Sequence, residues 1–240
     1  MRFLVVLFFV FIFSFVVLAP AGVFAFSGSG SGTSGSPYLV TSCSQLEEVA
    51  NNLTAYYQQT ADIDCTGTTY IPIGSSGSQF TGTYDGNGFK IEHVTIDSIL
   101  GYVGLFGVVG NGGVVTKVGL VSGSVTVNDD DQEPETGGIV GENHGTISKS
   151  YSLVDITNAP RRSYVGGIVG LNYGTVSDAY ATGDVTETGI ESEVGGVVGD
   201  STSGQVMRVY STGSVTGGDE NGGLVGEGVT LSDSFSTAIV

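Results

Sequence analysis

A five-residue Gly-rich unit recurs at a nearly constant interval in the second half of the chain. Its copies start at residues 137, 166, 195 and 222, so successive copies are 29, 29 and 27 residues apart. A fixed interval in this range is typical of proteins built from stacked repeats. The glycines that define the four copies are Gly137, Gly138, Gly141, Gly166, Gly167, Gly170, Gly195, Gly196, Gly199, Gly222, Gly223 and Gly226.

The residues between these glycines predict β structure. Val, Ile, Thr and Tyr dominate, in short runs broken by Gly, Asn and Asp, and the region from 66 to 240 has no helical periodicity. Such runs predict short strands. We expect three strands per repeat and an all-β, parallel β-helix whose coils stack about 4.8 Å apart. The glycines are expected in turns with positive φ and in tight corners.

Stacked coils place equivalent residues in columns. Ile156, Val185 and Val215 would form an inward aliphatic column, and the threonines that follow them would face outward. Another column alternates in charge, which favours register because neighbouring coils then present opposite charges. Its members are Lys149, Asp178, Arg208 and Asp233.

One aromatic column allows two interpretations. Strict alternation puts Ile147, Lys149 and Tyr151 on one face, although a charged column in the core would be costly. The chain therefore either bends between Ser148 and Ser150, which would put the aromatic rings in the core, or leaves the rings exposed as a ladder. The phenylalanine in the column favours the core. The column contains Tyr151, Tyr180, Tyr210 and Phe235.

The chain divides into four segments. Residues 1–25 form a signal peptide, with an apolar run from Phe3 to Val17 and a small-x-Ala cleavage pattern ending at Ala25; the alternative is an uncleaved anchor. Residues 26–37 are a flexible Gly/Ser linker. Residues 38–100 are expected to hold an N-terminal cap and the first coils. A capping box from Ser44 to Glu47 predicts a short helix there. Residues 101–240 carry the repeats, and the terminal strand at Val240 could associate end to end with another chain.

Composition restricts the partners. Asp and Glu number 24 against 7 Lys and Arg, giving a net charge of −17, so a nucleic acid would be repelled. The same acidity suits a halophilic source. Cys43 and Cys65 are expected to form a disulfide after export, and Asn52 begins a glycosylation sequon.

Some acidic residues could carry chemistry. Glu142, Asp200 and Glu227 share the column after the Gly-rich unit, and the last two could lie one coil apart, as in a retaining glycosidase. Their surroundings of Gly, Ser and Thr predict open, ionised carboxylates. The acidic stretch 128–135 is expected to be a solvated loop, because it lacks the spacing of a calcium site. We expect no catalytic residue, no cofactor and no metal.

The repeats resemble the GLUG motif. The resemblance rests on Gly-Gly-(Ile/Leu)-Val-Gly, on Asn-x-Gly-Thr at Asn143 and Asn172, and on Tyr180-Ala-Thr-Gly. It is fairly specific and covers nearly all of 38–240. It implies a right-handed parallel β-helix at the cell surface and no catalytic residues. The third repeat departs from the pattern, with Ser203-Gly204-Gln205 where Asn-x-Gly would stand.

These observations predict a non-catalytic secreted or cell-surface module for adhesion, binding or scaffolding. Its partner would be a surface ligand such as a glycan or another surface protein, with no membrane contact after signal cleavage. The alternative is a carbohydrate-active β-helix enzyme, a polysaccharide lyase or hydrolase. A glycan-binding screen with a reducing-sugar assay would separate the two.

Overall fold

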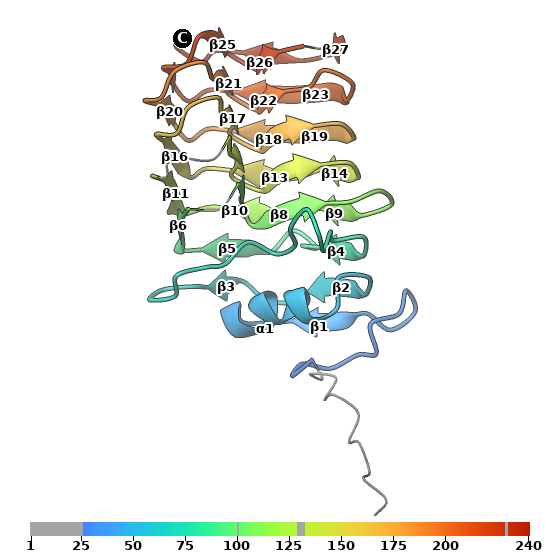
Figure 1. The fold of residues 1–240 in the computed structure, drawn as a ribbon. Helices are drawn as coiled ribbons and strands as arrows, with labels where there is room; N and C mark the ends of the chain where they lie inside the picture. Colours follow the sequence, from blue (N-terminus) through green and yellow to red (C-terminus); the bar gives the residue numbers. More distant parts are fainter. Residues whose placement is uncertain (1–25, 100, 129–132, 229) are drawn as a thin grey trace, which may run out of the picture.

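The computed structural model describes residues 26–99, 101–128, 133–228 and 230–240, which form a parallel β-solenoid with its coils stacked along one axis (Figure 1). The predicted signal peptide, 1–25, and residues 129–132 of the acidic stretch lie outside the described residues. No helix among the described residues is long and apolar enough to span a bilayer.

The first sheet runs along the whole solenoid and receives one or two strands from each coil. Its 13 strands are β1 (Tyr38–Val40), β2 (Tyr56–Gln59), β3 (Ile63–Asp64), β4 (Thr83–Asp85), β5 (Lys90–Glu92), β9 (Val114–Thr116), β10 (Gly119–Leu120), β14 (Thr146–Ser148), β15 (Tyr151–Ser152), β19 (Thr175–Ala181), β23 (Gln205–Ser211), β27 (Thr230–Ser232) and β28 (Phe235–Ser236).

Three further sheets have five strands each. The second contains β6 (Val94–Ser98), β11 (Gly123–Val127), β16 (Asp155–Asn158), β20 (Val185–Glu187) and β24 (Val215–Thr216). The third contains β7 (Tyr102–Val103), β12 (Glu135–Gly137), β17 (Tyr164–Gly166), β21 (Glu193–Gly195) and β25 (Glu220–Gly222). The fourth contains β8 (Phe106–Val109), β13 (Val140–Asn143), β18 (Val169–Asn172), β22 (Val198–Asp200) and β26 (Val225–Glu227). The expected three strands per coil are thus too few, because the Gly-rich unit turns a corner and contributes a strand on each side of it.

The predicted aliphatic register is confirmed. Ile156 pairs with Val185, which pairs with Val215, and all three side chains are buried. The threonines that follow them also pair in register and point outward. Burial of these columns depends on the neighbouring coil, so the core is continuous along the solenoid.

A left-handed residue bends the first sheet in each repeat coil. Lys149 has φ 52°, and its equivalents Asp178 and Arg208 have φ 54° and 50°. The bend reverses the alternation, so that Ile147 before it and Ser150 after it both point inward. The expected bend between Ser148 and Ser150 is therefore present.

The aromatic column nevertheless stays outside the core, contrary to our prediction. Because Ser150 takes the inward position after the bend, Tyr151 faces outward and is half-buried. Tyr151 stacks on Tyr180 with ring centroids 4.9 Å apart, and the Tyr180–Tyr210 and Tyr210–Phe235 distances are 4.7 Å and 5.3 Å. Phe235 is 59% exposed. Each ring covers the face of its neighbour, so the ladder presents mainly ring edges to solvent.

The repeat glycines lie at tight corners, as expected, but they do not supply positive φ. The left-handed residues elsewhere in the repeats include charged ones such as Arg162 and Glu191, and also other glycines such as Gly217 and Gly228. Because these repeat glycines have no side chain, neighbouring backbone and side-chain atoms can approach them closely. A Cβ added to Gly166 would lie 2.1 Å from the carbonyl oxygen of Val169, and one on Gly138 would lie 2.5 Å from Ser152 Oγ.

The N-terminal helix α1 (Cys43–Glu47) continues into a 3-10 turn η1 (Glu48–Asn51) beside the first coil (Figure 1). Its N-cap is Ser42, whose hydroxyl accepts a bond from Gln45 N at 3.4 Å, and not Ser44 as the capping box predicted. Leu46 and Val49 enter the core. A disulfide joins Cys43 to Cys65, with Cα atoms 5.1 Å apart.

The Gly/Ser segment 26–37 differs from the flexible linker that its composition suggested. Leu39 N donates to the Ser29 carbonyl at 2.8 Å, and Tyr56 N donates to the Gly32 carbonyl at 3.0 Å. Phe26 packs on Tyr38 with ring centroids 4.7 Å apart. These contacts use groups that the first coil would otherwise leave unpaired, so the segment covers the N-terminal edge of the solenoid.

Candidate functional site

Two columns of side chains flank the corner formed by each Gly-rich unit. The column on the third sheet consists of Tyr102, Glu135, Tyr164, Glu193 and Glu220. The column on the fourth sheet consists of Val108, Glu142, Leu171, Asp200 and Glu227. We call these ten residues the corner columns.

The third glycine of each unit brings the corner columns together. A Cβ added to Gly170 would lie 2.4 Å from Thr136 N, and one on Gly199 would lie 2.4 Å from Val165 N. Each fourth-sheet strand therefore packs directly on the third-sheet strand of the preceding coil. This close approach buries the carboxyl group of Asp200 and partly buries those of Glu135, Glu142 and Glu193, whereas Glu220 and Glu227 on the last coil stay exposed.

Burial and mutual repulsion change the acidity of these carboxyl groups. Burial raises the pKa of Glu135 to about 8, and the charge of Glu142 adds to the effect. Burial likewise raises the pKa of Glu193 to about 8, with Glu227 and Asp200 contributing. At neutral pH, Glu135 and Glu193 are consequently protonated for the most part.

The prediction for Asp200 and Glu227 is half right. They pair one coil apart, as expected. Asp200 is only 6% exposed, however, and burial raises its pKa even though the Thr202 hydroxyl donates to it at 2.7 Å. The expectation of two open carboxylates is therefore wrong for Asp200, because the corner glycine removes the space that water would occupy.

Sequence reasoning missed the third-sheet column altogether. Glu135 and Glu193 each stand two residues before a Gly-Gly pair, as do Tyr164 and Glu220. Aligning the repeats on these pairs reveals the column. Its burial follows only from the packing across Gly170 and its equivalents.

Beside the corner columns, an aromatic pair is held by a carboxylate. His144 Nε2 lies 2.6 Å from Glu142 Oε1, and the His144 ring stacks on Tyr173 with centroids 4.8 Å apart and planes 18° apart. Tyr173 is 43% exposed. Below the rings, Asn143 Nδ2 donates to Asn172 Oδ1 at 2.8 Å, and both amides are fully buried.

Tyr173 and His144 line a shallow depression of ≈ 370 Å³ on the surface. Its other walls are small and polar, and include Thr146, Thr175, Ser203 and Gln205. A second depression of ≈ 390 Å³ shares Ser203 and Gln205 and continues to Ser232 on a later coil. The two together run across several coils along the first sheet.

The alternating charge column forms as predicted. Arg208 makes two bonds to Asp178, at 2.7 Å and 2.8 Å, and Lys149 lies on the other side of that carboxylate. Arg208 is the largest cause of the lowered pKa of Asp178. The pairs are exposed, so they contribute more to the register of the coils than to the stability of the fold.

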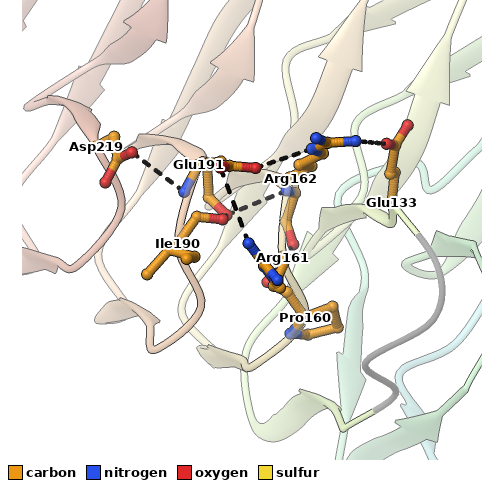
Figure 2. A network of polar contacts seen from close by, with 9 residues as sticks. Glu133, Pro160, Arg161, Arg162, Ile190, Glu191 and Asp219 are labelled. Atoms are coloured by element: carbon orange, nitrogen blue, oxygen red, sulfur yellow. Dashed lines mark hydrogen bonds and ion pairs between the residues drawn. The ribbon is translucent and has the colours of Figure 1, made fainter.

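A second charge ladder lies at the corner after Pro160, shown in Figure 2. Arg162 bonds Glu191 at 2.9 Å and Glu133 at 3.3 Å, while Glu191 N bonds Asp219 at 3.2 Å. Four successive coils are linked in this way, and Arg161 adds a longer contact to Glu191. The arginines act as corner residues and do not converge on a pocket.

The remaining candidates lie apart from these features. Asn52 is exposed and accepts a bond from the Thr54 hydroxyl at 3.0 Å, so its sequon is accessible. Among the described residues, no three His, Cys, Asp or Glu side chains come together with a geometry that could hold a metal ion.

This architecture defines a class: a parallel β-solenoid whose coils turn on glycine-rich corners. Within that class, residues 162–186 match the GLUG motif, which confirms the resemblance drawn from the sequence.

Two relatives are larger proteins. The chain is 35% identical over 48% of its length to a protein named as a Gly-rich membrane protein of Evansella cellulosilytica, and 32% identical over 54% of its length to halomucin of Haloquadratum walsbyi. It spans only 14% and 2% of their respective lengths.

A solved structure shares the fold. A protein of Bacteroides ovatus named as an immunoglobulin A1 protease superposes with a TM-score of 0.61, covering 86% of this chain and 77% of that one at 21% identity. At this identity the likeness concerns the fold alone.

Proposed function

We propose that the chain is a non-catalytic binding module of a protein displayed at the cell surface. The observation that carries this proposal is the recurrence of the corner columns. Glu135, Glu193 and Glu220 occupy the same position on different coils, and so do Glu142, Asp200 and Glu227. An active site needs one particular arrangement of side chains at one place. A column of this kind recurs on every coil, because each repeat contributes an equivalent residue to it.

The names of the two relatives support display at the cell surface. One relative is named as a membrane protein and the other is halomucin of Haloquadratum walsbyi. A net charge of −17 keeps such a surface hydrated and dispersed in concentrated salt. The exposed charge ladders hold the coils in register, so the module is suited to present a surface at a distance from its attachment.

A second candidate, a carbohydrate-active enzyme, is favoured by one observation. Glu135 is an acid with its pKa raised to about 8, and Glu142 lies close enough to repel its charged form. A protonated carboxyl with a second acidic group beside it is the arrangement that glycoside hydrolysis uses. Glu193 beside Glu227 has the same character, so catalysis would reside at Glu135 or at Glu193.

The two candidates separate in an assay of product release from neutral and acidic polysaccharides. We expect no turnover by the wild-type chain. Turnover that Glu135→Gln or Glu193→Gln abolishes, and that Asp97→Asn leaves unchanged, would establish the enzyme. Glutamine replaces a carboxyl that is already neutral in the fold, and Asp97 is an exposed acid on the second sheet, so neither change should disturb the coils.

A further inference from the structure

The departure of the third repeat from the GLUG pattern has a structural result. Leu171 pairs with Asp200 and Thr175 pairs with Gln205, so the later coil holds one more residue between these positions than the earlier one. The extra residue falls in the turn Ser201–Gly204, which carries no aromatic side chain. The turn below it carries Tyr173.

Tyr173 consequently has a different neighbour on each side. His144, from the preceding coil, stacks on one face of its ring. Toward the following coil, the ring borders the depression that Ser203 and Gln205 line. Within the described residues, no other aromatic ring stacks on Tyr173. In the tyrosine ladder, by contrast, the faces of the inner rings are covered on both sides.

The ring is also fixed before any ligand arrives. His144 is held by Glu142, and the backbone N of Tyr173 donates to the Asn143 carbonyl at 2.8 Å. The buried amide ladder of Asn143 and Asn172 continues to Ser201 Oγ at 3.0 Å. A ligand that stacks on Tyr173 therefore loses little binding free energy to ordering the site.

The chemistry of the walls indicates what would bind. An aromatic face carries partial negative charge and attracts the C–H groups on the apolar side of a sugar ring. Thr146, Thr175, Ser203 and Gln205 offer hydroxyl and amide groups to sugar hydroxyls. Burial raises the pKa of Tyr173, and the nearby acidic groups of Glu142 and Asp200 add to the effect; these same groups would repel an anionic sugar.

We propose that this depression is a binding site for neutral polysaccharides, with the Tyr173 ring as the stacking platform and His144 as its support. The proposal rests on the binding function proposed above and gives it a ligand class. The neighbouring depression, which extends to Ser232, lets the bound chain run across the coils.

The test is calorimetric titration of the whole chain with three hexasaccharides: cellohexaose, chitohexaose and hexagalacturonate. We expect at least one of the two neutral sugars to bind and hexagalacturonate not to bind. Tyr173→Ala should weaken binding at least tenfold, and Tyr173→Phe, which keeps the ring face, should stay within about threefold of wild type. Tyr56→Ala is the matched control, because Tyr56 is 40% exposed on the first coil and far along the sequence from the depression.

Absence of binding by both neutral sugars, equal binding by Tyr173→Ala, or tighter binding of hexagalacturonate would each overturn the site. None of these results bears on catalysis. Product release in the polysaccharide assay would refute the non-catalytic function while leaving the Tyr173 site to be decided by the titrations.

Discussion

Replacing a glycine of the Gly-rich unit tests whether close packing of neighbouring coils is the reason that glycine is required there. Gly166 lies in a central coil, where a new Cβ would meet Val169 O at 2.1 Å, Gly199 N at 2.7 Å and Val198 Cα at 2.7 Å. All three atoms belong to backbone, and ordinary contact needs at least 3.4 Å. These atoms belong to strands β18 and β22. Neither strand can move alone, because each is hydrogen-bonded to the strands of the neighbouring coils.

Overpacking of a tight core costs about 1–3 kcal/mol, and contacts with backbone put Gly166→Ala at the upper end. A loss of about 3 kcal/mol lowers the unfolding midpoint of a chain of this size by roughly 6–12 °C. Circular dichroism on heating would measure it. Gly77→Ala is the control, since nothing lies within 4 Å of its added Cβ. A fall of less than about 3 °C for Gly166→Ala would refute the packing argument.

Three other predictions concern solution conditions. Glu135 and Glu193 have folded pKa values of about 8, above the unfolded value of 4.5, so their stabilisation is complete below about pH 4.5 and is lost as pH rises toward 8. The melting midpoint should therefore fall over this range, and the double change to glutamine should flatten the slope; an unaltered slope would contradict the assignment. Reduction of the Cys43–Cys65 bond, which closes a separation of 22 residues, should cost about 3 kcal/mol, and a midpoint unmoved by reductant would argue against it. Raising NaCl from about 0.1 M to about 2 M should raise the midpoint by screening acidic repulsion, and a lower midpoint would disprove the role of charge.

The repeat made the architecture and much of the register predictable. Columns such as Ile156–Val185–Val215 follow from periodicity alone, because coils of equal length must stack equivalent residues. The charge column could be aligned for the same reason.

What periodicity could not provide was the direction of side chains near irregular backbone. One left-handed residue at Lys149 moved Tyr151 from the expected core to the surface. The burial of Asp200 depends on contact between coils across Gly199, a distance that no local pattern encodes. The Gly/Ser segment 26–37 was expected to be flexible, yet it is ordered. Its hydrogen bonds are made by backbone groups, and amino-acid composition does not reveal these.

The single additional residue in the turn Ser201–Gly204 has a consequence for specificity. A perfectly periodic rod offers the same surface at every step, so a long polymer could lie on it in many equivalent alignments and slide between them. An insertion breaks this translational symmetry at one coil. Tyr173 is uncovered at that coil, so a polymer bound there is anchored at one position and its alignment along the rod is set.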